Sequence, residues 1–307
     1  MELGQLEAMI AVARTRSFAQ AAQEIGRTQP AVSITIKKLE EEIGAPLFDR
    51  VRRDIRMTAA GQVFYDYAVK MLNLRTQAKE SIDELRKLQT GKVRIGANES
   101  TSLYLLPETI LSFRAQFPSI RVEAFRTASM QLPYEIKERN LDLGIISFDP
   151  EDPDIESFPL MEDELVLIVL PGHRLRKKRK VVLADLATEV FIAHNVHSPS
   201  RQQVIEVFRK KRVPLNIGIE LSNIETIKDF VRRKMGIAFI PHLCVEKELS
   251  DGEFRVVRVQ DFHHTRTIRA ILLKDSNHSH AALQFLKVLL ESKSRKVEKS
   301  KGGALDS

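Results

Sequence analysis

A long amphipathic stretch from Thr58 to about Leu88 constrains the fold of this 307-residue chain more than any other feature. Thr58 is a good N-cap for a helix, and the apolar residues that follow recur at alternate steps of four and three, with Arg75 in one slot. The stripe consists of Phe64, Ala68, Met71, Ala78, Ile82 and Leu85. A lone helix of this length cannot bury such a stripe by itself. We therefore predict a linker helix over residues 58–90 that pairs with the same helix of a second chain.

The first 57 residues predict three short helices that are separated by polar turns. Ser17 is placed to cap the second helix and Thr28 the third, with Pro30 in the first turn of the third, where its missing N–H costs nothing. Gly44 is a natural end for that helix. Two short helices joined by a tight turn, the second with a polar outer face, are typical of a helix-turn-helix.

The third helix carries a pattern that suits contact with DNA. When Val32, Ile36 and Leu39 face inward, the outer face is largely polar. Arg27, Lys37 and Lys38 add three positive charges before the first acid of the helix, Glu40. A basic segment around Arg50 and Arg53 follows and predicts a wing against phosphates. The candidate DNA-binding residues are Arg27, Thr28, Gln29, Pro30, Ser33, Ile34, Lys37, Lys38, Arg50 and Arg53. A solvated helix face has the same pattern, so that alternative stays open at this point.

After Gly91, strand-like apolar segments alternate with helical segments. The strand-like segments are 93–96, 120–123, 141–146, 165–169, 190–192, 217–219 and 237–240. The helical segments are 103–117, 129–138, 200–211 and 223–234. Such alternation is typical of mostly parallel α/β sheets, whose ligands bind at the carboxyl ends of the strands. A stretch of this length suits two small lobes with a cleft between them.

Polar residues that follow strands and begin helices are candidates for binding a small effector in this cleft. They are Asn98, Ser100, Thr101, Ser102, Ser129, Ser200, Arg201 and Asn223. Hydroxyl groups at helix N-termini favour anions, and Arg201 can hold a carboxylate, sulfate or phosphate through two hydrogen bonds. Glu99 and Glu225 oppose a free anion, and the same polar residues are also ordinary helix caps. We expect no cofactor, and a small organic or inorganic anion as the effector.

Composition excludes several other classes of protein. Apolar runs such as Leu165–Leu170 are far shorter than the roughly 20 residues that a membrane-spanning helix needs. With no export signal expected and a single cysteine, Cys244, we expect a cytoplasmic protein. His242 and Cys244 lack a second pair of ligands at metal spacing, so we expect no metal site. The net charge of +7 does not by itself indicate DNA binding, because six basic residues lie together in 174–180.

Five blocks of sequence resemble the LysR-type transcriptional regulators, in the order and spacing of that family. They are Ser17-Phe18-Ala19-Gln20-Ala21-Ala22, Thr28-Gln29-Pro30-Ala31-Val32-Ser33, Lys37-Lys38-Leu39-Glu40, Leu47-Phe48-Asp49-Arg50 and Thr58-Ala59-Ala60-Gly61. The family's usual final signature is also present, as Gly236-Ile237-Ala238-Phe239-Ile240-Pro241. The resemblance therefore covers nearly the whole chain and is most specific in residues 1–62.

The resemblance implies the fold class α + α/β. It comprises an N-terminal winged helix-turn-helix DNA-binding domain over 1–57, the linker helix over 58–90, and an effector-binding domain over 91–300. That C-terminal domain is expected to be a two-lobed α/β domain like the periplasmic binding proteins. Lobe I would span about 91–161 and 267–293, and lobe II about 162–266.

The resemblance also implies a ligand-responsive, sequence-specific DNA-binding transcriptional regulator. Such a protein would bind promoter DNA as a homodimer through the linker helix, commonly as a homotetramer, and would contact RNA polymerase if it is an activator. Matching positions assign DNA contacts to Gln29, Pro30, Ser33, Lys37 and Arg53. Ile34 departs from the family, which often has a long polar side chain there, and contact with a thymine methyl is the alternative.

Two other functions are weighed against this one. A transport-type solute receptor would share the C-terminal domain, but the helix-turn-helix and the expected absence of an export signal oppose it. An enzyme on an α/β scaffold would need an acid or base with a perturbed pKa in the cleft. No nucleophile motif or Walker-type phosphate loop is present, so we expect no catalytic residues.

Overall fold

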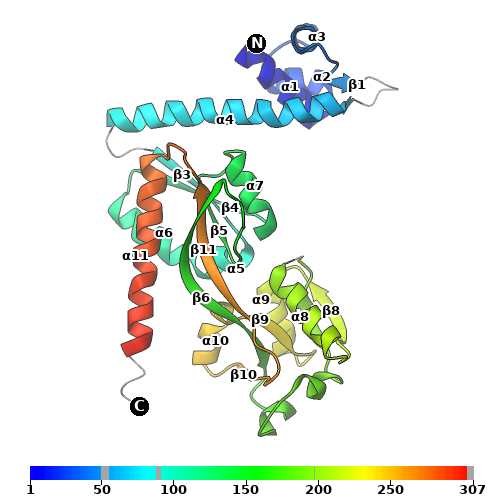
Figure 1. The fold of residues 1–307 in the computed structure, drawn as a ribbon, viewed down its shortest axis with the longest axis vertical. Coiled ribbons are helices and arrows are strands. Elements are labelled where there is room, and N and C mark those ends of the chain that lie inside the picture. Colours follow the sequence, from blue (N-terminus) through cyan, green and yellow to red (C-terminus); the bar gives the residue numbers. More distant parts are fainter. Residues whose placement is uncertain (50–54, 88–90, 197, 303–307) are drawn as a thin grey trace. The chain divides into compact units, whose positions relative to one another are not determined.

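The computed structural model describes residues 1–49, 55–87, 91–196 and 198–302 (Figure 1). The chain divides into an N-terminal unit, residues 1–88 with 138–140, and a C-terminal unit formed by the remaining residues. The prediction of a helix-turn-helix followed by a long helix and a two-lobed α/β domain is confirmed.

The N-terminal unit is built from helices whose ends follow the local sequence signals. Its elements are α1 (Leu3–Thr15), α2 (Phe18–Glu24), α3 (Gln29–Ile43), β1 (Phe48–Asp49), β2 (Arg56–Met57) and α4 (Ala59–Lys87). The Ser17 side chain accepts a hydrogen bond from the Gln20 N–H, and the Thr28 side chain accepts one from the Ala31 N–H. Gly44, with φ +77°, ends α3 in the left-handed region. These caps fix where the two short helices begin.

The core of the N-terminal unit lies between α1, α2 and α3. Met9, Val32, Ile36 and Leu39 are completely buried in it, and the first turns of α4 pack against the same cluster. β1 and β2 pair antiparallel, with Phe48 opposite Met57, and form the base of the predicted wing. Arg50 and Arg53, predicted at its tip, lie outside the described residues.

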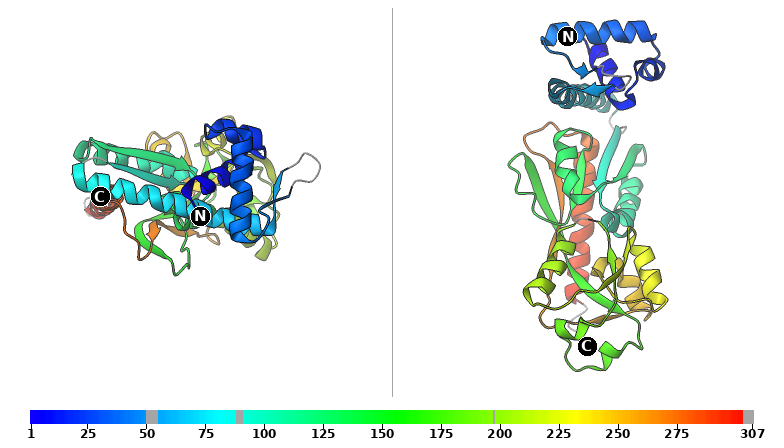
Figure 2. Two further views of the ribbon diagram at one scale, coloured as in Figure 1. Left: turned by 90° about the horizontal axis from the view of Figure 1, so that it is seen from above. Right: turned by 90° about the vertical axis from the view of Figure 1, so that its right-hand side faces the viewer.

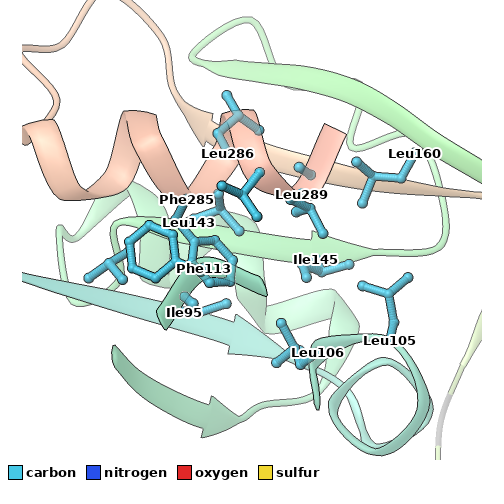
Figure 3. Close-up of a cluster of buried hydrophobic side chains, with 14 of the residues drawn as sticks. Ile95, Leu105, Leu106, Phe113, Leu143, Ile145, Leu160, Phe285, Leu286 and Leu289 are labelled. Carbon is cyan, nitrogen blue, oxygen red and sulfur yellow. The ribbon is translucent and has the colours of Figure 1, made fainter. Parts of the chain in front are cut away.

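Lobe I of the C-terminal unit is a sheet covered by helices. Its strands are β3 (Gly91–Ala97), β4 (Ile120–Arg126), β5 (Leu143–Ile146), the first part of β6 (Ile155–Val169) and β11 (Thr265–Leu273). Its helices are α5 (Glu99–Tyr104), α6 (Leu106–Gln116), α7 (Leu132–Lys137) and α11 (His280–Gly302). Phe113 of α6 and Phe285 of α11 meet the strand residues Ile95, Leu143 and Ile145 in one buried cluster (Figure 3).

Lobe II contains the end of β6 and the segments that follow it. Its strands are β7 (Phe191–His194), β8 (Ile217–Leu221), β9 (Ala238–Pro241) and β10 (Arg255–Val257). Its helices are α8 (Pro199–Lys210), α9 (Ile224–Arg232) and α10 (Glu246–Ser250). Both β6 and β11 run between the lobes side by side (Figure 1; Figure 2 gives two further views), with one irregularity in their register at Ile268/Arg269. The two lobes are therefore joined by continuous strands.

The expectation of mostly parallel sheets is wrong for the central strands. β3 pairs parallel with β4 and β5, but β11 pairs antiparallel with both β5 and β6. The physical reason is that the chain enters lobe II through β6 and returns beside it through β11. The predicted helix over 103–117 is confirmed from Leu106 to Gln116, but its start is wrong. α5 ends at Tyr104 and α6 starts anew at Leu106, because Pro107 lacks the N–H that a continuous helix would need.

Candidate functional sites

The outer face of α3 is the first candidate site. Arg27, Thr28, Gln29, Pro30, Ile34, Lys37 and Lys38 are exposed, and Ser33 is half-buried. The exposed fraction of Ile34 is 57%, which is unusual for a large apolar residue. The Lys37 ammonium lies 3.7 Å from the Glu41 carboxylate, and both side chains are mostly in solvent. Such a pair is weak, so the Lys37 ammonium is available to a phosphate.

Thr28 has a structural role that limits its contacts. Its hydroxyl caps α3 at 3.4 Å from the Ala31 nitrogen. The side chain therefore orients the first turn of the helix, while the exposed Gln29 and Pro30 begin the helix itself. A surface that presents the N-terminal end of a helix and several cations suits the phosphate backbone and the base edges of DNA.

The exposed apolar stripe of α4 differs from the predicted one. Ala68 is completely buried within the single chain and so is not available to a partner. Phe64 is half-buried against the chain's own helix-turn-helix core, so only part of its side chain is available. Met71 is half-buried, Ala78 and Ile82 are exposed, and the side chain of Leu85 lies outside the described part. Val63, Tyr67 and Leu74 are exposed by 61%, 60% and 52%. They share one helical face with Ala78 and Ile82, and this set of five is called the α4 stripe below.

A cavity of about 410 Å³ lies between the two lobes of the C-terminal unit. Polar side chains from both lobes line it, and we call Asn98, Glu99, Ser100, Arg126, Ser129 and His194 the polar wall. Apolar side chains of lobe II also line it, and we call Leu165, Phe191, Val204, Leu215, Ile217 and Phe239 the apolar wall. Ser200, Arg201 and Arg266 also line the cavity. This size and mixture of surfaces are typical of small-molecule sites.

Glu99 is the electrostatic centre of the polar wall. Its carboxylate is 5% exposed and accepts a hydrogen bond from the Ile224 N–H at 3.0 Å, at the start of α9. The Arg126 guanidinium donates to it at 2.9 Å, and His194 Nε2 lies 3.2 Å away. Glu99 and Arg126 come from lobe I, whereas Ile224 and His194 come from lobe II. One buried carboxylate thus links the two lobes.

The other cations of the cavity also have partners. Arg266 donates to Asp163 through Nε at 2.9 Å and Nη2 at 2.7 Å, and both side chains are buried. Arg201 donates to the Glu220 carboxylate and to the His194 carbonyl. Burial, together with the charge of Arg266, lowers the pKa of His264, whose Nε2 lies 3.2 Å from Ser200 Oγ. The lowered pKa favours the neutral form of the His264 ring.

The structure places five of the eight predicted effector residues on the cavity: Asn98, Ser100, Ser129, Ser200 and Arg201. Thr101 is buried and donates to the Asn98 side chain, and the Ser102 hydroxyl donates to the Ala97 carbonyl. Asn223 caps α9 by accepting from the Thr226 N–H. These three residues are not among those that line the cavity.

Several cavity residues were missed by sequence reasoning. Arg126 is the last residue of β4 and His194 is the last residue of β7. The rule that ligands bind at the carboxyl ends of strands could have found both. The apolar wall carried no such signal, because half-buried and fully buried apolar residues have the same sequence pattern.

Glu99→Ala is expected to lower the free energy of unfolding by about 2 kcal/mol, because it leaves the buried Ile224 N–H without its acceptor. Chemical denaturation of the full chain measures this change. Glu220→Ala is the control, because that carboxylate is 48% exposed, and its loss should cost less than about 1 kcal/mol. Equal effects of the two substitutions would contradict the structural role of Glu99.

Metal and thiol chemistry find no support in the described ranges. Within residues 1–49, 55–87, 91–196 and 198–302, no group of three or more His, Cys, Asp or Glu side chains is arranged to hold a metal ion. Cys244 is buried, and this burial raises the pKa of its thiol. None of the helices in the same ranges is long and apolar enough to cross a membrane.

The combination of a helix-turn-helix, a long helix and a two-lobed domain with a ligand-sized cavity defines a class of ligand-responsive transcriptional regulators. Two family models match the chain: "Bacterial regulatory helix-turn-helix protein, lysR family" over residues 3–62 and "LysR substrate binding domain" over residues 86–294. The chain belongs to the LysR family of transcriptional regulators. The members of this family are regulators and not enzymes, which removes the enzyme alternative.

Individual relatives match over almost their full length. A "Probable RuBisCO transcriptional regulator" of Cyanidioschyzon merolae is 32% identical over 294 residues, which cover 94% of this chain and 97% of that protein. The "HTH-type transcriptional activator CmpR" of Synechocystis sp. is 33% identical over 288 residues, 94% of each chain. Among solved structures, full-length CbnR in complex with its target DNA superposes with a TM-score of 0.69 at 20% identity, covering 95% of this chain and 100% of that one.

Proposed function

We propose that this protein binds promoter DNA through α3 as a homodimer joined by the α4 stripe. Two such dimers form a homotetramer. A small molecule bound in the interlobe cavity controls transcription. The observation that carries the proposal is the exposed outer face of α3, with Gln29 at its N-terminal end and Lys37 further along, in a chain that also has a ligand-sized cavity. CmpR is named an activator and CbnR has been solved with its target DNA, which supports a promoter-binding role here. As an activator the protein would also contact RNA polymerase.

Each candidate contact on α3 has a distinct expected chemistry. The Gln29 amide can donate and accept at once and so can pair with an adenine edge in the major groove. Lys37, one turn after Ser33 on the same face, carries a solvated ammonium that suits a phosphate. The exposed Ile34 has no polar atom and suits the methyl group of thymine.

The experiment compares Gln29→Ala and Lys37→Ala by fluorescence anisotropy on the protein's own upstream region and on random duplex, at several salt concentrations. Gln29→Ala should weaken binding to the specific site roughly tenfold and relax preference at one base position. Lys37→Ala should weaken binding to every duplex alike and reduce the slope of log affinity against log salt by about one.

Matched controls come from the exposed surface of lobe II. Gln203→Ala and Lys211→Ala change the same residue types on solvent-exposed positions of that lobe, and both should bind DNA as the parent does. The proposal is wrong if the parent protein shows no preference for its upstream region over random duplex, or if the α3 variants behave like these controls.

A further inference from the structure

We propose that the effector is an organic monoanion with an apolar body about the size of an aromatic ring. Its acid group lies at Arg201 and its body lies against the apolar wall. This inference rests on the function proposed above and names the chemical class that the cavity selects.

The layout of α8 places an acid group and an apolar body along one line. Arg201, Val204, Ile205 and Phe208 follow each other at steps that share one face of a helix. Arg201 lies in the first turn, where the helix dipole favours an anion. Its own N–H donates to the Ser198 hydroxyl, so the guanidinium is the group that would meet the ligand's acid group. Val204 and Ile205, one turn further, line the cavity, while Phe208 is buried behind them in the core of lobe II.

The apolar wall has no hydrogen-bonding side chain to offer a hydrophilic ligand. Val204, Leu215, Ile217 and Phe239 are half-buried: each packs on the core of lobe II and also lines the cavity. Phe239 stacks on Phe191 with 5.8 Å between ring centroids and 8° between planes, which holds the aromatic part of the wall in place. Hydroxyl or phosphate groups placed there would lose water without gaining a partner, whereas an apolar body buries apolar surface.

Charge compensation in the cavity limits the ligand to one negative charge. Arg126 and Arg266 pair with Glu99 and Asp163, carboxylates that are almost completely buried and have further hydrogen bonds. Arg201 differs, because its partner Glu220 has a side chain that is 48% exposed. Glu220 can return to solvent when a ligand carboxylate replaces it, at little cost. A second negative charge on the ligand would lie near the Glu99 carboxylate. Among the described lining residues, no uncompensated cation is there to balance it.

The test measures binding to the full-length protein by isothermal titration with five probes at constant ionic strength: benzoate, cyclohexanecarboxylate, acetate, inorganic phosphate and benzamide. Benzoate or cyclohexanecarboxylate should bind at least roughly tenfold more tightly than acetate, phosphate and benzamide. The proposal is overturned if acetate or phosphate binds as tightly as the ring acids, or if neither ring acid binds.

Variants separate the two halves of the proposal. Leu215→Asp places a carboxylate in the apolar wall and should weaken the ring acids at least roughly tenfold. Val204→Thr keeps the side-chain shape and should weaken them in the same direction, which provides a second measurement if Leu215→Asp does not fold. Arg201→Gln should bring the affinities of benzoate and benzamide together. Leu111→Asp, on an exposed position of α6, is the control and should bind every probe as the parent does.

The outcome can be distinguished from failure of the proposed function, because promoter binding by the same preparation is measured separately. If the protein binds its promoter selectively but does not prefer ring acids, the proposed regulatory function stands and the proposed class of effector is rejected. Preference for ring acids that is unaffected by Leu215→Asp, Val204→Thr and Arg201→Gln rejects the placement in this cavity.

Discussion

The double variant Tyr67→Glu, Leu74→Glu is expected to sediment as a monomer of 35.0 kDa and to bind its promoter roughly 100-fold more weakly than the parent. Both side chains are more than half exposed on the α4 stripe and contribute little to the folded single chain. In a dimer, the two introduced carboxylates of one α4 helix would face the same two carboxylates of the partner helix. Repulsion between these charges would separate the chains. A monomer has only one helix-turn-helix domain, so it loses the gain in affinity that comes from binding two half-sites at once. Analytical ultracentrifugation and anisotropy measure the two effects.

The matched control is Gln62→Glu, Thr76→Glu, which adds the same two carboxylates to exposed positions on the opposite face of α4. This control should sediment and bind like the parent protein. A Tyr67→Glu, Leu74→Glu protein that retains the parent's mass in solution would show that the α4 stripe does not join the chains.

Gly61→Ala is expected to destabilise the N-terminal unit by about 3 kcal/mol and to abolish promoter binding. A Cβ atom at this position would lie 2.0 Å from the Leu47 carbonyl oxygen and 2.9 Å from its carbon. That oxygen accepts the Thr58 N–H, and the Leu47 side chain is completely buried in the helix-turn-helix core. The backbone must therefore move, and the hydrogen bond that starts α4 is lost with it.

Chemical denaturation followed by circular dichroism measures this loss. Gly172→Ala is the control, because a Cβ atom there meets nothing within 4 Å and its φ lies outside the left-handed region. The close approach of α4 to Leu47 would be refuted by a Gly61→Ala protein that unfolds at the parent's denaturant concentration.

The elements of the N-terminal unit were predictable because their signals are local. The Ser17 and Thr28 caps and the left-handed Gly44 act within a few residues, so the sequence places the boundaries of α2 and α3 closely. The predicted dimer stripe was partly wrong for the opposite reason. Phe64 and Ala68 continue the same spacing as Ile82, and only the folded chain shows that Ala68 is fully buried and that Phe64 packs in part on the helix-turn-helix core.

The candidate effector site was predictable only in its polar part. Asn98, Ser129, Ser200 and Arg201 stand at strand ends or helix starts, so a topological rule finds them. The role of Glu99 depends on Arg126, His194 and Ile224, which come from three distant segments. No local sequence pattern indicates that these three segments meet at Glu99. The antiparallel orientation of β11 was missed for a related reason. It depends on pairing with β6, which lies about 100 residues earlier in the sequence.

The continuous strands β6 and β11 determine how one lobe can move against the other. Neither crossing contains a loop, although the pairing has one irregularity at Ile268/Arg269. Because the twist between adjacent strands varies, we expect relative motion of the lobes to be a torsion of this two-stranded ribbon. The buried pair of Asp163 on β6 and Arg266 on β11 clamps the ribbon near its lobe II end. A molecule bound between the lobes would fix the twist of the β6–β11 ribbon. A small change in this twist would produce a larger displacement at the far ends of the domain.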